Sequence, residues 1–423
     1  MVAHTAPLVQ TSATYLTSSS RSNKPMPKST RRRRSRPSRH GSAPSKPKNN
    51  HSSSQGHNRT KKLAIIKSRH RQHIMANLAA SKARRARWAE IALGTQRIVM
   101  GDGKYVEERT CVPSSLPSPL LTEPFSEGSV ALPVVHDIGL QIQFSRQGTQ
   151  FYPHYSEHLA KWYIAPQVKD SQTSPTTTIE FTSMSPLSTA RSITRTSAVG
   201  VLSFASAKRP GGGYLNGGDE QEERLARSTA LVASLTAPAG LNFYEELRRF
   251  ASEDGSGLQA HSVLYSPGVS VIRSDDERDD GKFIEPYAVD IVSAVPVNAA
   301  AVRRRYHVTE SDSQMFEDGI RTATKERLAR VLRVFEDHGD RQLVLGAFGC
   351  GSNENNVEMI AEIWAELLVT GPSSPEEGKA RFANVFESIV FAIPPRLIER
   401  FKTAFDMRVF EAEVEKAASD EDD

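Results

Sequence analysis

The sequence predicts a three-layer α/β domain in the second half of the chain, on three observations. Short apolar runs alternate with amphipathic stretches from about residue 200 onward. The runs have the length of buried strands, whereas the amphipathic stretches repeat their apolar side chains every three to four residues, as helices do. Gly-rich segments join some of the runs to the next stretch, which is typical of strand-to-helix connections.

The elements follow in chain order. Strands are predicted for residues 200–205, 260–272, 287–295, 342–348 and 388–393. Amphipathic helices are predicted for residues 220–235 and 320–338. A third is expected to begin near Glu354, and its apolar side chains lie within residues 357–368. Strands that alternate with helices in this way indicate a sheet covered on both faces.

The N-terminal part of the chain has a different composition. Residues 1–89 contain 21 Lys or Arg and no Asp or Glu, whereas residues 90–423 contain 33 basic and 49 acidic residues. Residues 1–62 have almost no large apolar side chains, so we expect a disordered basic arm. Ala, Leu, Ile, Lys and Arg dominate residues 63–93, which predicts helix in one or two pieces.

The cluster Arg31–Arg36 within this arm is typical of a nuclear-import signal or of a patch that contacts nucleic acid. A solvated arm without a specific partner is one alternative, and an organellar transit peptide, which would direct the protein to mitochondria, is another. The expected location is therefore nuclear or nucleo-cytoplasmic, with nucleic acid or import receptors as partners of the arm. No run of 18 apolar residues is present, so we expect no membrane partner.

These features divide the chain into four parts. They are a basic arm at 1–62, a helical accessory region at 63–165, the α/β domain at 166–405 and an acidic, disordered tail at 406–423. A polar linker or long loop is expected at 164–178. The two cysteines, Cys111 and Cys350, are far apart, which excludes a disulfide framework and a zinc-ligand set.

The loop after the strand at 200–205 contains the glycines Gly211, Gly212 and Gly213. Three consecutive glycines permit positive φ values and let main-chain N–H groups approach a ligand closely. A strand-to-helix loop of this kind is suited to hold a phosphate or a ribose. By itself the triplet is weak evidence, because a flexible loop explains it equally well.

The helix that follows begins with Gln221, Glu222 and Glu223. Asp219 and Glu222 have the spacing of a capping box, which explains Glu222 but neither Gln221 nor Glu223. Paired carboxylates beside a sugar-binding loop suit the hydrolysis of a glycosidic bond, which needs an acid for the leaving oxygen and a base for water. Two adjacent carboxylates also repel, so one of them is pushed toward the neutral form, although the helix dipole opposes that shift.

A second Gly-rich loop follows the strand at 342–348. It contains the residues Gly346, Ala347, Phe348, Gly349, Cys350 and Gly351. Backbone donors at the start of a helix can hold a diphosphate, and this loop is expected to do so. The alternative is a turn that needs small residues for tight packing. The presence of both loops in one α/β domain favours the binding interpretation.

At these residues the sequence resembles the microbial type of poly(ADP-ribose) glycohydrolase, whose members carry a Gly triplet, a short spacer and Gln-Glu-Glu on a macrodomain fold. The resemblance extends over roughly 179–393. It implies a macrodomain-like mixed sheet between two helical layers, with Glu223 as catalytic acid/base and Glu222 orienting the distal ribose or supporting its neighbour. It implies no metal and no diffusible cofactor, and poly(ADP-ribose) or ADP-ribosylated protein as partner.

The resemblance also implies which residues bind the substrate. These are Ser206, Gly211, Gly212, Gly213, Gln221, Gly346, Ala347, Phe348, Gly349, Cys350 and Gly351. The sequence departs from the family at Ser203, where Asn is usual, and at Ser352-Asn353, where Val-Phe often supplies a stacking ring. Stacking is then expected from Phe348 or Tyr214, or is lost.

These departures leave three alternatives to chain hydrolysis open. A non-catalytic macrodomain could bind ADP-ribose without cleaving it, and a related hydrolase could remove a single ADP-ribose from a protein. A protein that binds nucleic acid through its basic arm is the third.

Overall fold

The computed structural model describes residues 53–111, 130–165, 176–193, 198–276, 278–279, 281–309, 311–371 and 380–421. The Arg31–Arg36 cluster and most of the expected arm and linker lie outside the described residues. The chain divides into two compact units, Met1–Arg69 and His70–Asp423. Of the first unit, only the beginning of helix α1 (Ser53–Val99) is described. Among the described residues, no helix is both long enough and apolar enough to cross a membrane.

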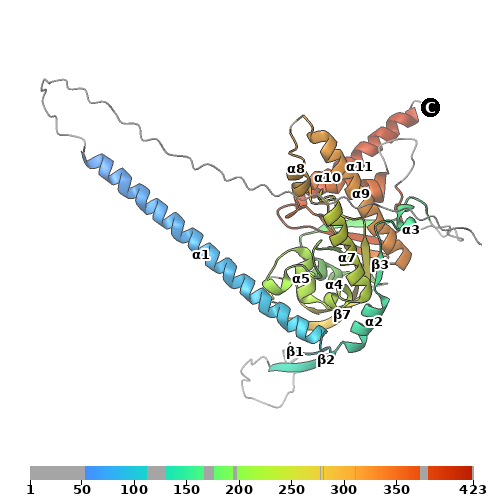
Figure 1. Ribbon diagram of the computed structural model, residues 1–423, viewed down its shortest axis with the longest axis horizontal. Coiled ribbons are helices and arrows are strands. Elements are labelled where there is room, and N and C mark those ends of the chain that lie inside the picture. Colours follow the sequence, from blue (N-terminus) through green and yellow to red (C-terminus); the bar gives the residue numbers. More distant parts are fainter. Residues whose placement is uncertain are drawn as a thin grey trace, which may run out of the picture. The chain divides into compact units, whose positions relative to one another are not determined.

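A seven-stranded mixed sheet forms the centre of the second unit, in the order β3-β6-β7-β5-β8-β9-β4 (Figure 1). The strands are β3 (Gln150–Tyr152), β4 (Thr178–Thr182), β5 (Val199–Phe204), β6 (Val263–Arg273), β7 (Phe283–Ala294), β8 (Gln342–Leu345) and β9 (Ser388–Ala392). The strands from β7 to β4 are parallel, whereas β6 pairs antiparallel with both β7 and β3. Central strand β5 is buried almost throughout, as parallel strands covered on both faces are.

Helices cover both faces of the sheet. One face packs against α3 (Glu157–Ala160), α8 (Ala299–Arg305), α9 (Ser313–His338), α10 (Val357–Ala365) and α11 (Ile398–Glu421). The other packs against α2 (Gly139–Gly148), α4 (Pro186–Ser192), α5 (Gln221–Ser228), α6 (Leu231–Leu235) and α7 (Pro238–Glu253). Each face has its own apolar cluster, so the predicted three-layer α/β/α arrangement is confirmed.

Smaller elements complete the fold. Strands β1 (Lys104–Cys111) and β2 (Val130–Asp137) form a separate antiparallel pair. A short 3-10 helix, η1 (Tyr214–Asn216), lies in the loop after β5, and a π-helical turn, η2 (Glu366–Thr370), extends α10. Strand β3 lies upstream of the boundary expected at 165 but belongs to the main sheet, so the sheet extends across that boundary.

Three helices differ from the sequence-based expectation. Helix α1 is a single helix from Ser53 to Val99, one of the two forms expected, but it begins inside the expected arm. The helix expected over 220–235 is two helices, because Ala230 N donates to Ser270 O (2.8 Å), which takes this segment to the edge of β6. Helix α11 continues to Glu421, into the stretch expected to be a disordered tail. The patterns predicted helix correctly, but a long-range hydrogen bond divided the segment at 220–235.

A buried carboxyl group lies in the turn between α9 and β8. Asp340 is only 1% exposed, and neither of its side-chain oxygens has a hydrogen-bond partner within the described part of the chain. Burial, and then the negative charge of Asp290, raise the pKa of Asp340 to about 9. The group is therefore protonated in the folded chain at neutral pH.

Replacing Asp340 with Asn should therefore stabilise the protein at alkaline pH. The unfolded chain ionises this carboxyl near pH 4 and the folded chain only near pH 9, so stability falls as pH rises between these values. Asn stays neutral, although its amide brings donors of its own, and we expect a net gain of about 2 kcal/mol near pH 8. Denaturant unfolding at about pH 5 and pH 8 measures the difference in free energy of unfolding between the variant and wild type. An equal difference at the two pH values would contradict the prediction.

Candidate active site

Two loops meet at the carboxyl ends of the neighbouring parallel strands β5 and β8. We call residues 205–220 the first loop and residues 346–356 the second loop. The rings of Phe204 and Phe348 pack edge to face, with centroids 5.3 Å apart. A Cβ added to Gly351 would lie 3.7 Å from Oε2 of Glu220. Ligands of open α/β sheets bind at this edge, outside the carboxyl ends of the strands.

Gln221 joins the start of α5 to the end of β5. Its Oε1 accepts a hydrogen bond from Phe204 N (2.8 Å), and its Nε2 donates to Leu202 O (2.7 Å). Both ends of the amide are therefore occupied by main chain, and the side chain fixes the helix start against the sheet. Substrate contact by Gln221 stays a prediction, and the positioning role is what the geometry adds.

Glu222 points into the protein and is 1% exposed. Its Oε2 accepts from Ser206 N (2.7 Å) and its Oε1 accepts from the hydroxyl of Tyr244 in α7 (2.8 Å). Burial raises the pKa of this carboxyl to about 7, against the lowering effect of these two hydrogen bonds, and the charge of Glu223 raises it further. The expectation that one carboxyl of the pair is pushed toward the neutral form is thus met at Glu222.

Glu223 is only half-buried, and the main chain of the first loop holds its carboxylate. Its Oε1 accepts from Gly213 N (2.6 Å), and its Oε2 accepts from Glu220 N (2.8 Å). The two neighbouring carboxylates thus have different surroundings. Glu222 is enclosed by protein, whereas Glu223 is partly exposed beside the backbone of the first loop.

The glycines of the first loop are needed because the backbone passes so close to Glu223. A Cβ added to Gly213 would lie 2.8 Å from Oε1 of Glu223, and one added to Gly218 would overlap the same carboxylate. Gly211 and Gly212 have positive φ values of 67° and 56°, which side chains rarely adopt. In this structure the glycines therefore enclose the candidate catalytic carboxylate, a role that the sequence did not suggest.

The capping box predicted from Asp219 and Glu222 is wrong by one residue. The N-cap is Glu220, and its partner three residues on is Glu223, whose side chain accepts the Glu220 N–H. Asp219 instead pairs with Arg224, with 2.8 Å between Oδ1 and Nε. Glu223 therefore has the capping role that the sequence gave to Glu222, and Glu222 is the buried member of the pair.

The second loop is longer and more tightly packed than expected. Helix α10 begins at Val357 rather than near Glu354, with Asn356 as N-cap. The ring of Phe348 is fully buried against Phe204, and a Cβ on Gly349 would overlap the amide of Asn355. Phe348 can therefore offer its main chain, but not its ring, to a ligand.

The structure also places the residues at which the sequence departs from its family. Tyr214, the other candidate for stacking, is buried against Ala226 and other residues of a small apolar cluster, so its ring does not face the loops either. The hydroxyl of Ser203 is buried without a hydrogen-bond partner in the described part of the chain. Cys350 is a free thiol, and burial raises its pKa to about 12, so it stays protonated.

The end of α1 supports the first loop, which the sequence analysis did not foresee. The guanidinium of Arg227 lies 4.8 Å from the centre of the Trp88 ring and donates to Gly218 O (2.7 Å). A Cβ on Gly217 would collide with Arg85 O, so the loop passes directly against α1. The contacts with α1 join residues more than 100 positions apart in the sequence, so no local pattern could have predicted them.

We therefore expect Trp88→Ala to lower kcat about tenfold, because Gly218 would lose the anchored Arg227 that holds it against Glu223. Lost packing and cation–π contact should also reduce the free energy of unfolding by about 2 kcal/mol. Trp88→Phe retains an aromatic ring and should keep most of the kcat and most of the free energy of unfolding. Steady-state kinetics and thermal unfolding test this, and a Trp88→Ala enzyme with unchanged kcat would exclude a positioning role.

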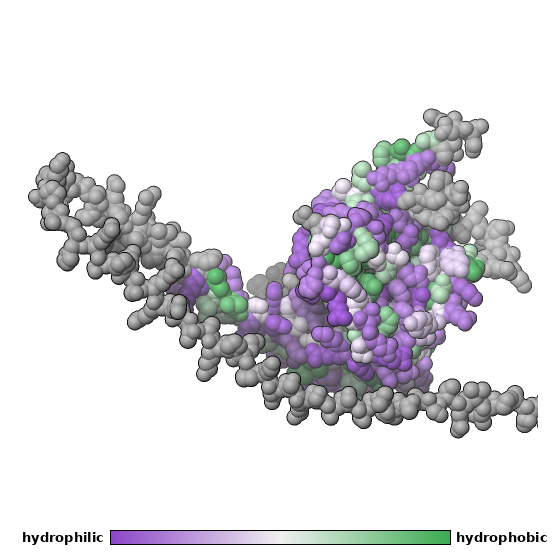
Figure 2. Space-filling model, turned by 45° about the horizontal axis from the view of Figure 1, so that its top comes forward, coloured by the Kyte–Doolittle hydropathy of each residue, from purple (hydrophilic) through white to green (hydrophobic). Residues whose placement is uncertain are grey.

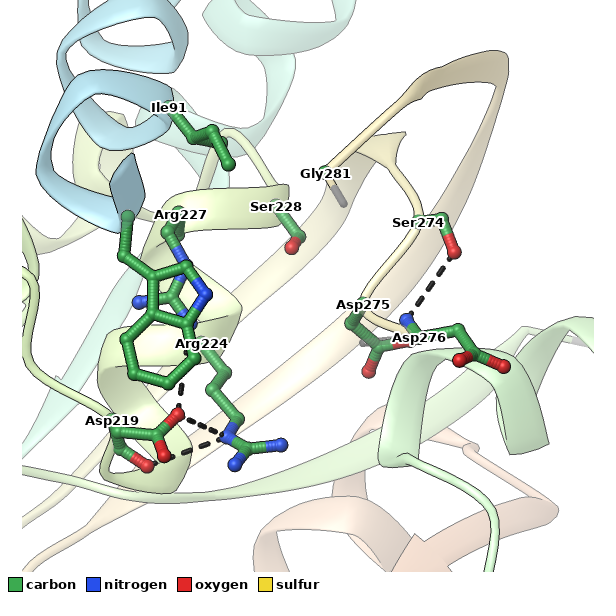
Figure 3. A pocket seen from close by; sticks show the side chains of 10 residues that line it. Ile91, Asp219, Arg224, Arg227, Ser228, Ser274, Asp275, Asp276 and Gly281 are labelled. Carbon is green, nitrogen blue, oxygen red and sulfur yellow. Dashed lines mark hydrogen bonds and ion pairs between the residues drawn. The ribbon is translucent and has the colours of Figure 1, made fainter. Parts of the chain in front are cut away.

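Two hollows lie close to this support rather than at the paired carboxylates. One, of about 40 Å³, lies between α1, α5 and the turn that joins β6 to β7. Figure 3 shows Asp219 bonded to Arg224 at its edge. The other, of about 690 Å³, lies between the end of α1, α2 and the start of α7. Neither is lined by Glu222 or Glu223, so we assign the site to the open surface between the two loops. Within the described ranges, no group of three or more His, Cys, Asp or Glu could hold a metal ion.

Comparison with known proteins gives this arrangement a family. A family model for the microbial-type PARG catalytic domain matches residues 127–274. The poly(ADP-ribose) glycohydrolase of Thermomonospora curvata is 30% identical, with 77% of this chain and 99% of that one covered and a TM-score of 0.56. The Deinococcus radiodurans enzyme in complex with ADP-ribose is 31% identical, with 63% and 96% covered and a TM-score of 0.51. A search of curated proteins finds no match.

These likenesses extend over nearly the whole length of both solved enzymes, so they include the sheet and both helical layers. The T. curvata enzyme has also been solved bound to the inhibitor ADP-HPD. The fold is accordingly macrodomain-like, as the resemblance implied. The chain belongs to the family of microbial-type poly(ADP-ribose) glycohydrolases and is an enzyme of that class.

Proposed function

We propose that the enzyme cleaves the ribose–ribose bonds of poly(ADP-ribose) and releases ADP-ribose, with Glu223 as the acid/base. The observation that carries this proposal is the position of Glu223. Glu223 is half-buried beyond the carboxyl end of β5, and its carboxylate lies against Gly213 and Gly218 of the first loop. Binding of ADP-ribose by the D. radiodurans relative supports the choice of substrate.

In the proposed reaction, protonated Glu223 donates its proton to the glycosidic oxygen as the bond from that oxygen to the anomeric carbon breaks. Positive charge develops on the ribose, and a water molecule attacks its anomeric carbon. The Glu223 carboxylate takes the proton that this water loses. The enzyme thus ends each turnover with Glu223 protonated, as it began. Glu222 does not touch the substrate in this scheme, since its side chain is only 1% exposed and its carboxylate lies inside the protein against Ser206 and Tyr244.

The second loop is proposed to hold the diphosphate. Among the described residues, the N–H groups of Gly349 and Gly351 donate to no protein oxygen, so they can donate to a phosphate. Gly351 is exposed and faces Glu220 of the first loop across the surface between them. Glycines there let a phosphate approach the backbone without meeting a side chain.

The test is to identify the product. The purified enzyme is incubated with automodified poly(ADP-ribose) polymerase and, separately, with a protein that carries single ADP-ribose groups. Released ADP-ribose from the polymer, with the single groups left on the protein, is the expected result. Release from the second substrate alone would make the enzyme a mono-ADP-ribosyl hydrolase, and saturable binding without turnover would make it a reader.

A further inference from the structure

The exposed part of α1 has an unusual composition. Every residue from 71 to 87 is exposed, and this stretch contains five Lys or Arg and no Asp or Glu. Residues 90–423, which include the α/β domain, are acidic, with 33 basic and 49 acidic residues. A polyanion that approaches the folded protein would therefore be repelled by most of it and attracted to this helix.

Five of these residues share one face of the helix. Arg71, Met75, Leu78, Lys82 and Arg85 are spaced by four, three, four and three residues, which places them in one stripe. Met75 and Leu78 are 60% and 59% exposed, and apolar side chains lie beside hydrophilic ones on this helix (Figure 2). We call these five residues the α1 stripe. It spans about 20 Å, at about 1.5 Å per residue.

The α1 stripe ends at the candidate active site. The carbonyl of Arg85 lies against Gly217, and three residues further on Trp88 contacts Arg227, which donates to Gly218 O. Gly218 in turn lies against the carboxylate of Glu223. A chain that leaves the site over the first loop would therefore meet the helix at Arg85 and could follow the stripe toward Arg71.

We propose that the α1 stripe binds the poly(ADP-ribose) chain outside the catalytic site, an inference that rests on the proposed function. Each unit of this polymer carries a diphosphate and an adenine. Arg71, Lys82 and Arg85 supply cations for the phosphates, and Met75 and Leu78 supply an apolar surface for the bases. Nucleic acid has similar chemistry, but continuity with the loop around Glu223 favours the enzyme's own polymeric substrate.

The test compares a long and a short substrate. The variant R71Q/K82Q/R85Q removes three charges from one helix face with a good helix-forming residue. We expect its KM for poly(ADP-ribose) of about twenty units to rise about tenfold near physiological salt, with kcat unchanged. The slope of log KM against log salt should fall by about 2, at about 0.7 per lost phosphate contact on a single strand. KM for the ADP-ribose dimer, too short to reach the stripe, should not change.

The matched control is K161Q/R191Q/R248Q, which removes three exposed cations elsewhere on the second unit. It should leave KM for both substrates within about twofold, because its charges do not lie in a stripe beside the loops. Circular dichroism and thermal unfolding of both variants show whether the helix is retained. An R71Q/K82Q/R85Q variant that is folded and has the wild-type KM for long polymer would overturn the inference.

A different partner would give a different pattern. If R71Q/K82Q/R85Q weakened binding of a polyadenylate RNA but left KM for long polymer unchanged, α1 would be a nucleic-acid surface and the inference would be wrong. Failure of the proposed function is separate, since wild-type enzyme would then release ADP-ribose from neither long polymer nor dimer. A wild type that is active on both, with a variant impaired only on long polymer, supports the inference.

Discussion

Replacing Glu223 with Gln is expected to lower kcat on poly(ADP-ribose) about a thousandfold. The amide can neither donate a proton to the leaving oxygen nor take one from water, and general acid–base catalysis contributes about 10²–10⁴-fold. The fold should tolerate the change, because Gln also serves at this position of a capping box. Its single oxygen can accept from Gly213 N or from Glu220 N, although not from both.

The measurement is the rate of ADP-ribose release, together with the Kd for ADP-ribose and the melting temperature. Binding should stay within a few-fold of wild type, since the second loop is unchanged. Glu220→Gln is the matched control, because it removes the same charge from the same turn and leaves the Glu220 N–H available to Glu223. If Glu223→Gln kept more than about a tenth of the wild-type kcat, Glu223 would not be the acid/base.

The second large effect concerns the pH dependence of stability at Glu222. The unfolded chain ionises this carboxyl near its ordinary pKa of 4.5, whereas burial holds the folded pKa at about 7. The folded state therefore binds the proton more tightly, and its stability falls as pH rises from about 4.5 through 7. At about 1.4 kcal/mol per pH unit, the loss amounts to about 3 kcal/mol.

Glu222→Gln should remove this loss, because Gln is uncharged at every pH. Its oxygen can accept from Ser206 N while its amide donates to the Tyr244 oxygen, so the buried contacts survive. The free energy of unfolding of the variant minus that of wild type should be about 3 kcal/mol larger at pH 8 than at pH 4. Urea unfolding across this pH range measures the difference.

Tyr244→Phe gives the opposite shift and so serves as the control. The Tyr244 hydroxyl lowers the pKa of Glu222, and its removal should move the midpoint of the pH dependence upward. A midpoint that does not respond to Tyr244→Phe, or an unchanged pH dependence in Glu222→Gln, would place the titration elsewhere. Asp340 also contributes to the pH dependence over this range, and Asp340→Asn removes its contribution.

Much of the fold was predictable because its signals are local. Strand β5 is an apolar run of six residues, five of them buried, and α9 shows a helical repeat from Ile320 onward. One wrong prediction of a helix end has a distant partner as its cause. The break after α5 depends on Ala230 pairing with Ser270 of β6, forty residues further along the chain.

The candidate site divides in the same way. The sequence placed the Gly triplet and the Gln-Glu-Glu motif in one strand–loop–helix unit, and the structure keeps them there. It could not tell which of the two glutamates is buried, because adjacent helix positions differ by about 100° in direction and only the packed neighbours decide this. Tyr244 and Ser206, which make Glu222 the buried member, come from α7 and the first loop.

By itself, then, the sequence determined the α/β fold class, the two Gly-rich loops and the pair of acids at the start of α5. These rest on periodicity and on residues that permit particular backbone conformations, and both are properties of short segments. Only the tertiary structure decided that Glu223 caps α5, that Gln221 is bound to β5, and that α1 supports the first loop. These depend on burial and on contacts between distant segments, which a local pattern does not encode.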